Sequence, residues 1–431
     1  MLTVAYLANE FPSAVEPYVS DEIEELEKRG VHVVPGSVRI SRSLPKCQPA
    51  IVLTPLTLAV AASALWLCLR EWQRIRPLIA RVFFRGSEGP FQRAKALVHT
   101  LLGACYAVML KDRGIEHIHV HHGYFGSWIG MTAARLMDVG FSVTLHGSDL
   151  LLSGSYLDVK LANCSFCLTI SEYNRRYILE HYPEVEARKI LVARLGVDVP
   201  NADKALPRTM KKSMTLLLLA VGRLHAVKNH EFLVAACALL AARDIAFECV
   251  IAGDGPERGH LQSLIQKHDL ADKVALLGHV PREQMDSLYD RADVLVMTSR
   301  SEGIPLVLME AMARGKIVVA PAITGIPELV LGGKTGFLYE SGSMNDLVDC
   351  LSFIDSMMRA ESKGDQRRPH HAAAARQLDW IRHAARVQVR HNFNRKTNLD
   401  FFAEMFLQHL AYKSRQKSKN IPDENLILQQ I

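Results

Sequence analysis

Cysteines are few and dispersed in this sequence of 431 residues, and its first residues lack a basic stretch. Of its eight cysteines, only Cys164 and Cys167 form a C-x-x-C pair. Because no second pair or neighbouring histidine set completes a zinc site, we expect both thiols to pack in the core. The pattern excludes a disulfide-rich secreted domain and is typical of a reducing cytosol. The N-terminal stretch MLTVAYLANEF begins like a strand and has no basic region, so we expect a cytoplasmic protein without a signal peptide.

An excess of one charge is also lacking. Lys and Arg number 51, Asp and Glu number 45, and the formal net charge is +6. This basicity is mild and spread along the chain, and no nucleic-acid-binding motif accompanies it, so we expect no nucleic-acid partner. Hydrophobic residues make up 49% of the chain and charged residues 22%, which excludes a disordered or collagen-like protein. The length predicts two or three domains.

One charge-free run stands out against this even background. Residues 50–69, AIVLTPLTLAVAASALWLCL, reach the length of a bilayer span, although Pro55 and several small residues weaken that interpretation. The following segment, 70–113, mixes Leu, Phe, Trp and Val with nine basic and three acidic residues. Apolar helices with basic faces are typical of surfaces that lie on anionic lipid. We favour such peripheral contact over plain buried helices or a true span, which stay open.

Strand and helix patterns alternate in both halves of the sequence. Apolar segments such as TVAYLA, FSVTL, TLLLLAV and KIVVA are separated by helical patterns. This β-α-β alternation predicts parallel sheets covered on both faces by helices. We therefore predict two doubly wound, Rossmann-like α/β domains facing a central cleft, with ligands beyond the carboxyl ends of the strands.

The predicted divisions follow from these patterns and from polar stretches between them. A basic, His- and Ala-rich stretch over 358–378 is expected to form a surface loop. The divisions are a first domain over 1–199 with a helical insertion at about 50–113, a linker over 200–213, a second domain over 214–390, a helix over 391–413 that crosses back to the first domain, and a tail over 414–431.

A basic turn follows the first strand of the second half. Gly222 at the strand exit permits a tight turn, and Arg223 and Lys228 come next. Near a helix start, an arginine can bind a diphosphate as a fork and a lysine can bind it as a point charge. Taken alone, the same residues are more often a solvated basic turn.

A second cluster follows the strand VLVM, in TSRSEGIPLVLMEAMARG. Gly303 lets the backbone approach a ligand closely, and Pro305 suits the first turn of a helix. The amides of Ile304 and Leu306 would then be free at a helix N-terminus, which is a ready anion site.

Two glutamates, Glu302 and Glu310, flank this anion site in the sequence. If Glu302 lies in the loop, both carboxylates can face one groove and bracket a diphosphate. Carboxylates accept hydrogen bonds from hydroxyls, which suits a sugar on one side and a ribose on the other. The simpler alternative is one glutamate that complements the helix dipole and one ordinary surface glutamate.

Together these segments resemble the retaining GT-B glycosyltransferases of family 4, the glycosyl transferases group 1. GRLHAVK, VIAGDGPERGHL, SEGIPLVLMEAMA and TGIPELV occur in the family's order and spacing, and the resemblance covers roughly residues 3–410. It implies that Glu302 contacts the donor sugar and Glu310 the ribose, while Arg223 and Lys228 bind the diphosphate and stabilise the leaving group. The implied donor-binding set is Gly222, Arg223, Lys228, Gly253, His279, Val280, Glu302, Gly303, Ile304, Pro305, Leu306 and Glu310.

The first half supplies further candidates at strand ends. His146 follows FSVTL, where a lone histidine is more often a satisfied loop residue, but the resemblance places it near the donor sugar. It therefore joins Glu302, Arg223 and Lys228 as the expected catalytic set. HVHHGYFGSW ends another strand; without a carboxylate at ligand spacing, we expect no metal site there. The candidate acceptor contacts are Glu16, Tyr18, His122, Asp149, Ser171 and Asn174, the last two in segments that resemble the cleft edge of the family's first domain.

A D-x-D motif, which holds a divalent cation in glycosyltransferases of another fold, is absent from the sequence. We expect Arg223, Lys228 and the helix terminus to replace the cation, with no cofactor besides the nucleotide-diphosphate-sugar donor. The N-terminal NEFPSAVEPYVSDEI resembles the exopolysaccharide (colanic-acid-type) branch. This implies a polysaccharide or lipid-linked acceptor and a peripheral place on the inner face of the plasma membrane. The alternatives are a soluble small-molecule acceptor and a non-catalytic nucleotide-sugar-binding partner subunit.

Overall fold

The computed structural model describes residues 2–13, 16–39, 51–152, 154–200, 215–362 and 369–419. Contacts divide the chain into two compact units. The first unit comprises Met1–Thr169, Arg175–Ala193 and Leu399–Ile431, and the second comprises Ile170–Asn174 and Arg194–Asn398. The predicted linker over 200–213 lies, apart from Pro200 at its start, outside the described residues, as do Cys47 and the end of the predicted tail.

The first unit is built on a seven-stranded sheet, in which every neighbouring pair is parallel, with the order β3-β2-β1-β4-β5-β6-β7. Its strands are β1 (Thr3–Glu10), β2 (His32–Arg39), β3 (Ile51–Val52), β4 (His117–His121), β5 (Gly140–Leu145), β6 (Phe166–Thr169) and β7 (Ile190–Val192). Strands β4 and β6 are buried along their whole length, as is typical of parallel strands covered on both faces.

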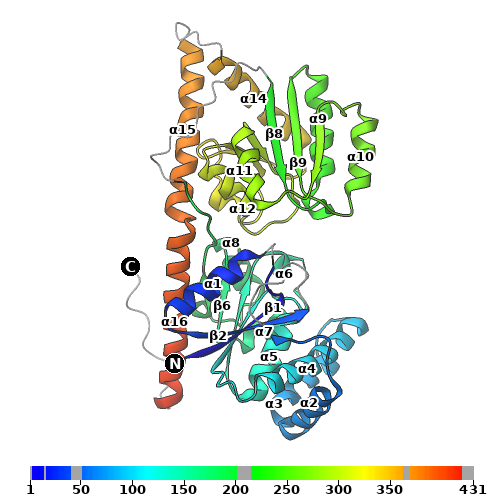
Figure 1. The fold of residues 1–431 in the computed structure, drawn as a ribbon, viewed down its shortest axis with the longest axis vertical. Coiled ribbons are helices and arrows are strands. Elements are labelled where there is room, and N and C mark those ends of the chain that lie inside the picture. The colour runs from blue at the N-terminus through cyan, green and yellow to red at the C-terminus, as the bar shows by residue number, and fades with distance from the viewer. Residues whose placement is uncertain are drawn as a thin grey trace. The chain divides into compact units, whose positions relative to one another are not determined.

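Helices cover both faces of this sheet (Figure 1). They are α1 (Pro17–Lys28), α2 (Leu58–Arg70), α3 (Trp72–Phe84), α4 (Pro90–Leu110), α5 (Phe125–Met137), α6 (Ser148–Leu151), α7 (Leu157–Asn163), α8 (Glu172–His181, whose first residues group with the second unit) and α16 (Arg395–Lys419). Helix α1 buries Val19, Ile23 and Leu26, a spacing of four and three residues that puts all three on one face.

The charge-free run of the sequence splits between two elements. Ile51 and Val52 form the edge strand β3, and α2 begins at Leu58. Helices α2, α3 and α4 gather in one group next to α5 (Figure 1). Within the described ranges, no helix combines the length and the apolarity needed to cross a bilayer.

The second unit holds a six-stranded parallel sheet with the order β10-β9-β8-β11-β12-β13. Its strands are β8 (Leu216–Val221), β9 (Phe247–Ala252), β10 (Val274–Gly278), β11 (Val294–Val296), β12 (Ile317–Pro321) and β13 (Phe337–Tyr339). Its helices are α9 (His230–Ala242), α10 (Arg258–Lys267), α11 (Arg282–Arg291), α12 (Leu306–Ala313), α13 (Ile326–Leu329), α14 (Met344–Ser362) and α15 (Pro369–Asn392). Both units are therefore doubly wound α/β sheets, as predicted.

Two local expectations were less accurate. The surface loop expected over 358–378 is wrong for its described parts, because α14 continues to Ser362 and α15 starts at Pro369. Alanine and arginine are strong helix formers, and they extend these helices where polarity suggested a loop. The last helix begins at Arg395 rather than 391, and its residues from Leu399 onward group with the first unit.

The isolated C-x-x-C pair lies where a helix end leads into a buried strand. Cys164 follows α7, Cys167 lies on β6, and both are buried free thiols. They pack in the core, as predicted.

Candidate active site

In each unit the strand order reverses once, between β1 and β4 and between β8 and β11. Ligands of doubly wound sheets bind at this switch point, beyond the carboxyl ends of the strands. The predicted site residues follow β4 and β5 in the first unit and β8 and β11 in the second.

In the second unit, Lys228 and Glu302 form an ion pair. Lys228 ends the 3-10 turn after β8 (Ala226–Lys228), and its Nζ lies 2.6 Å from Glu302 Oε1 in the loop after β11. The two side chains are largely shielded, with 23% and 11% of their surfaces exposed. The pair places one positive and one negative charge at the switch point. The lysine can bind a phosphate there, and the carboxylate can accept a hydrogen bond from a sugar hydroxyl.

The loop that carries Glu302 is held at several backbone points. Thr324 Oγ1 donates to the Glu302 carbonyl oxygen at 2.6 Å, and Thr298 Oγ1 donates to the Lys228 carbonyl oxygen at 3.2 Å. The Arg300 amide donates to the Val227 carbonyl oxygen at 2.8 Å. Thr324 has a φ of +47°, which is uncommon for a β-branched residue. These bonds join the loops after β8, β11 and β12 into one rigid edge.

Glu310 has a partner that the sequence did not suggest. The Tyr289 hydroxyl on α11 donates to Glu310 Oε2 at 2.6 Å, and Tyr289 is 2% exposed. Burial and the neighbouring Glu310 carboxylate raise the pKa of Tyr289 well above its usual value, so the phenol remains a donor. Glu310 thus keeps a second oxygen for a ligand while the first is fixed.

The helix start differs slightly from the prediction. Pro305 lies at the N-cap with an extended ψ of 125°, and α12 begins at Leu306 instead of including Pro305 in its first turn. Ile304 is buried upstream of this helix. The first amides of α12 belong to Leu306 and Val307, while Ile304 precedes the N-cap.

Two glycines allow the turn after β9 to meet the turn after β8. Gly253 and Gly255 have φ values of +150° and +159°, and a Cβ atom on Gly253 would lie 1.9 Å from the Gly222 carbonyl oxygen. The Gly253 amide also donates to the Gly278 carbonyl oxygen at 2.8 Å. The AGDGP segment thus draws the ends of β8, β9 and β10 together.

The remaining predicted donor residues line this same edge. His279 and Val280 follow β10, His279 is exposed, and Val280 is partly buried. Arg223 is exposed, and among the described residues its guanidinium has no hydrogen-bond or ion-pair partner. The second unit therefore gathers the whole predicted donor set along the carboxyl ends of four adjacent strands.

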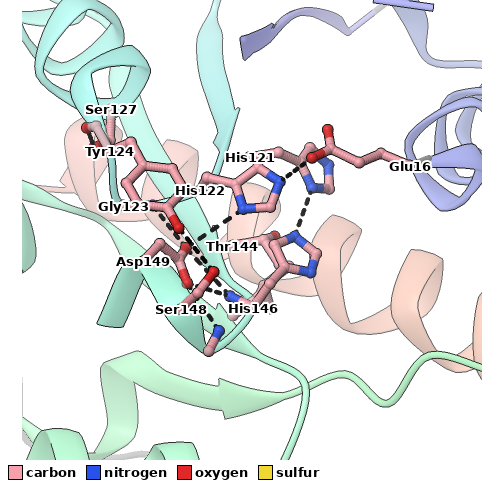
Figure 2. A network of polar contacts seen from close by, with 12 residues as sticks. Glu16, His121, His122, Gly123, Tyr124, Ser127, Thr144, His146, Ser148 and Asp149 are labelled. Atoms are coloured by element: carbon pink, nitrogen blue, oxygen red, sulfur yellow. Dashed lines mark hydrogen bonds and ion pairs between the residues drawn. The ribbon is translucent and has the colours of Figure 1, made fainter. Parts of the chain in front are cut away.

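In the first unit, the predicted residues form a polar cluster at the ends of β4 and β5 (Figure 2). His122 Nε2 lies 2.9 Å from Glu16 Oε1 and 3.5 Å from the Tyr18 hydroxyl. His146 Nε2 lies 3.1 Å from His121 Nδ1. The structure thus brings together Glu16, Tyr18, His122 and His146, which are far apart in the sequence.

The two outer histidines of this cluster differ in charge. Burial alone would lower the pKa of His122, but Asp149 and Glu16 outweigh it and raise the pKa to about 9. Burial and the charges of His122 and His121 hold the pKa of His146 well below its usual value. A charged imidazolium therefore lies beside a neutral imidazole near pH 7, with ring centroids 4.4 Å apart.

Asp149 does not have the exposure that an acceptor contact would need. Its side chain is completely buried and accepts hydrogen bonds from the amides of Gly123, His146 and Gly147 at 2.8 to 3.2 Å. The structure argues against the predicted acceptor contact, because the carboxylate is engaged by the protein itself.

A possible metal-ligand set occurs deeper in the first unit. Among the described residues, Glu22, His119 and His121 have ligand atoms within 4.8 Å of one another. However, His119 already bonds the hydroxyls of Ser142 at 2.7 Å and Thr144 at 3.0 Å through its two ring nitrogens. The arrangement therefore fits a buried hydrogen-bond network better than a metal site.

Ser171 and Asn174 were predicted to line the first domain, but the structure groups Ile170–Asn174 with the second unit. The reason is Glu328 on α13, whose carboxylate accepts from the Tyr173 amide at 2.7 Å and the Glu172 amide at 3.1 Å. A carboxylate at a helix N-terminus satisfies free amides there. The bond ties the start of α8 to the second unit.

Comparison with known proteins places the chain in a family. Residues 202–362, which carry the Lys228–Glu302 pair and Glu310, match the family model described as glycosyl transferases group 1. The chain belongs to the glycosyl transferases group 1 family.

Relatives within the family match part of the chain. A protein named as the colanic acid biosynthesis glycosyltransferase WcaL, from Salmonella typhimurium, is 38% identical over 157 residues, which are 35% of this chain and 38% of that protein. The amylovoran biosynthesis glycosyltransferase AmsK of Erwinia amylovora is 31% identical over 265 residues, or 58% of this chain and 64% of AmsK. The chain thus spans less than two thirds of the length of either relative.

The fold itself extends over the whole chain. HepE of Anabaena, solved in complex with UDP-glucose, superimposes with a TM-score of 0.65 over 95% of this chain and 100% of that one, at 16% identity. This likeness concerns the fold, and it agrees with the two parallel sheets of this group 1 family member.

Several residues of the site escaped the sequence reasoning. Tyr289, Thr324 and Glu328 contact predicted residues or their loops, and Lys160 lies under the histidine cluster. Glu328 and Thr324 both belong to the TGIPELV segment, so that motif was the available signal. For Tyr289 and Lys160, which lie within ordinary helical patterns, the sequence offers none.

Proposed function

We propose that this protein is a retaining glycosyltransferase that moves a sugar from a nucleotide-diphosphate-sugar to a polysaccharide or lipid-linked oligosaccharide acceptor. The names of its family relatives, which concern colanic acid and amylovoran biosynthesis, support a role in cell-surface polysaccharide synthesis. The solved neighbour with UDP-glucose supports a nucleotide-sugar donor.

The observation that carries the proposal is the edge formed by Arg223, Lys228, Glu302 and Glu310. Two cations and the open amides of α12 supply fixed positive charge for a diphosphate. In the proposal, Glu310 holds the ribose and Glu302 holds a donor-sugar hydroxyl, while Lys228 bridges from Glu302 to the phosphate. Positive charge fixed before the reaction stabilises the leaving nucleoside diphosphate, usually the largest single contribution to such catalysis, without a divalent cation.

The reaction breaks the bond between the anomeric carbon and the phosphate oxygen, and the leaving diphosphate takes the bonding electrons. The acceptor hydroxyl oxygen forms the new bond from the same face, and its proton goes to the departing phosphate oxygen. His146, neutral near pH 7, is assigned to a donor-sugar hydroxyl. Glu16, Tyr18 and the charged His122 are assigned to the acceptor.

We propose that the protein acts at a membrane surface. Nine of the exposed large hydrophobic residues in the described chain lie between Leu58 and Val98. On α2, the exposed residues Leu58, Leu65, Trp66 and Leu69 follow a helical spacing along one face, with Leu58 at 91% and Leu69 at 76% exposure. A cluster of exposed apolar side chains on a protein surface is typical of an interaction site.

The charges around this face support anionic lipid as its proposed partner. Arg70 lies over Trp66 with its guanidinium carbon 4.9 Å from the ring centroid, and Lys95 Nζ lies 4.3 Å from the Phe91 ring centroid. Arg76 and Arg85 are exposed and have no ion-pair partner among the described residues. Aromatic residues mixed with free cations suit the headgroup region of an anionic bilayer. We propose the cytoplasmic face of the plasma membrane, where the seven free cysteines of the described chain would stay reduced.

Donor turnover tests the proposal. The full chain is incubated with UDP- and GDP-sugars, with and without lipid-linked saccharide extracts, and release of nucleoside diphosphate is measured. Glu302→Gln and Lys228→Ala should each lose turnover, whereas Glu248→Gln, at an exposed position of β9, should not. A wild-type chain that binds nucleotide but releases none from any donor would make it a non-catalytic binding subunit.

A further inference from the structure

Lys160 on α7 is a buried amine that the proposed chemistry does not use, and burial lowers its pKa to about 7 against the opposing effect of Asp149. It is 3% exposed, and its Nζ donates to the carbonyl oxygens of Gly123 at 2.6 Å, Ser155 at 2.8 Å and Tyr124 at 3.2 Å. All three ammonium protons therefore have acceptors. A buried lysine is costly unless it is paired in this way, so its position calls for an explanation.

Asp149 also binds the loop that contains Gly123, through the backbone amides. Its Oδ2 accepts from the Gly123 amide at 2.8 Å, while its Oδ1 accepts from the amides of His146 at 3.0 Å and Gly147 at 2.8 Å. Gly123 thus donates to the Asp149 carboxylate through its N–H and accepts from Lys160 Nζ through its carbonyl oxygen. The two buried side chains hold the exit loop of β4 to the exit loop of β5.

The two loops carry the histidines of the candidate site (Figure 2). His122 precedes Gly123 and has a φ of +70°, a left-handed conformation in which only few non-glycine residues are found. His122 Nδ1 lies 3.7 Å from Asp149 Oδ2, and the His122 amide donates to the Thr144 carbonyl oxygen at 2.8 Å. The backbone of His122 is therefore held in a conformation that it would not adopt readily in a free loop.

We infer that Lys160 and Asp149 are positioning residues that lock the exit loops of β4 and β5, so that the imidazoles of His122 and His146 stand side by side at the site. The inference rests on the proposed function for what the two histidines do, but not for how they are held. Neither Lys160 nor Asp149 touches substrate in this role, because both side chains are buried.

The pKa of His122 distinguishes a positioning role of Asp149 from a role in packing alone. Besides Asp149, the groups that face His122 are Glu16, Tyr18, Tyr124 and His146. Asp149 and Glu16 together raise the pKa of His122 to about 9 against the opposing effect of burial. If Asp149 positions His122, replacing Asp149 must change the pKa of the His122 imidazole as well as kcat.

The experiment compares Asp149→Asn, Lys160→Met and Lys160→Arg with a matched control, Asp158→Asn. Asp158 is half exposed on the same helix as Lys160 and pairs with Arg81 at 3.0 Å, so this variant makes the same chemical change without touching Gly123 or the histidine loops. Histidine NMR titration gives the pKa of His122, and steady-state kinetics gives kcat and the donor KM. The stabilisation of the fold by UDP and GDP reports binding to the second unit.

In the wild type, His122 should titrate near 9, and in Asp149→Asn it should titrate at least about one pH unit lower. For Asp149→Asn and Lys160→Met, kcat should fall about 30-fold or more while the donor KM stays within about threefold, because all the proposed donor-binding residues except His146 lie in the second unit. Lys160→Arg, which keeps a charge and several donors, should retain more activity than Lys160→Met. The Asp158→Asn control should match the wild type in every measurement.

A wild-type His122 that titrates at or below 6.5, or an Asp149→Asn chain with unchanged titration and kcat, would overturn the inference. If Asp149→Asn and Lys160→Met do not fold, the titration of His122 in the wild type still decides the inference. If no chain turns over any donor but the His122 titration shifts as expected, the proposed function fails and the positioning role stands.

Discussion

Lys228 Nζ and Glu302 Oε1 lie 2.6 Å apart, although the two residues are 74 positions apart in the sequence. Their contact joins the loops after β8 and β11, the strands between which the order of the second sheet reverses. Each charge satisfies the other while both are largely shielded from water, so loss of either leaves an uncompensated charge at the place proposed for the diphosphate.

Replacing Lys228 by alanine should lower donor turnover by about 100-fold or more, since removal of one fixed electrostatic partner commonly costs that much. Nucleotide stabilisation of the fold should fall as well, because the proposed phosphate contact is lost. The readouts are nucleoside diphosphate release and a thermal-shift titration with UDP and GDP. The matched control is Lys267→Ala, at an exposed position at the end of α10. Wild-type turnover and nucleotide binding in Lys228→Ala would refute the proposed cradle.

Tyr289→Phe removes only the hydroxyl that donates to Glu310. A hydrogen bond to a charged group contributes roughly 1.5–3 kcal/mol, so a freed Glu310 should weaken nucleotide affinity by about tenfold. Isothermal titration with the nucleoside diphosphate measures this. Tyr339→Phe is the control, because its hydroxyl donates to the Met297 carbonyl oxygen away from Glu310. Equal affinities for the two variants would mean that Tyr289 does not orient the ribose contact.

His122 should make stability depend on pH with a definite sign. Its folded pKa of about 9 is raised above the ordinary 6.5, so its stabilising contribution is complete below about pH 6.5 and is lost as the pH rises through about 9. His122→Asn tolerates the left-handed backbone but cannot carry the charge. The difference in free energy of unfolding between wild type and variant, measured with urea from pH 6 to 9.5, should therefore shrink with rising pH. A constant or growing difference would contradict the assigned charge state.

The apolar face of α2 should govern lipid binding. In the double variant Leu65→Ser and Trp66→Ser, flotation with vesicles rich in anionic lipid should fall about tenfold or more, since each exposed apolar side chain contributes roughly 1.5–3 kcal/mol when buried. High salt should weaken the wild-type binding in part, because the cations around the face are screened. Trp380→Ser, a half-exposed tryptophan of the second unit, is the control. Binding that is indifferent to α2, to lipid charge and to salt would exclude this surface.

Chelation tests the role given to Arg223 and Lys228. If their charges replace a divalent cation, turnover after treatment with EDTA should stay within about twofold of the untreated enzyme. Restored activity on addition of Mg²⁺ or Mn²⁺ to an inactivated sample would instead assign the diphosphate to a metal.

The alternation of apolar strands and helices predicted both doubly wound sheets, because burial on two faces imposes continuous apolar runs on parallel strands. The same logic predicted where the candidate site residues lie. His122 and His146 follow strands of the first sheet, Gly222 and Glu302 follow strands of the second, and the ends of parallel strands meet at one edge of each sheet. Composition predicted secondary structure less well where polar composition and helix propensity pointed to different structures, as in the stretch from 358 onward. There the helices α14 and α15 continue, since alanine and arginine favour helix regardless of exposure.

Residue types and their places after strands were thus determined by the sequence alone, because backbone periodicity is a local property. Only the tertiary structure decided the partners: Tyr289 for Glu310, Glu328 for the start of α8, and Lys160 with Asp149 around Gly123. It also decided that His122 is charged and His146 neutral, since a pKa depends on burial and on charges brought close through space rather than along the chain.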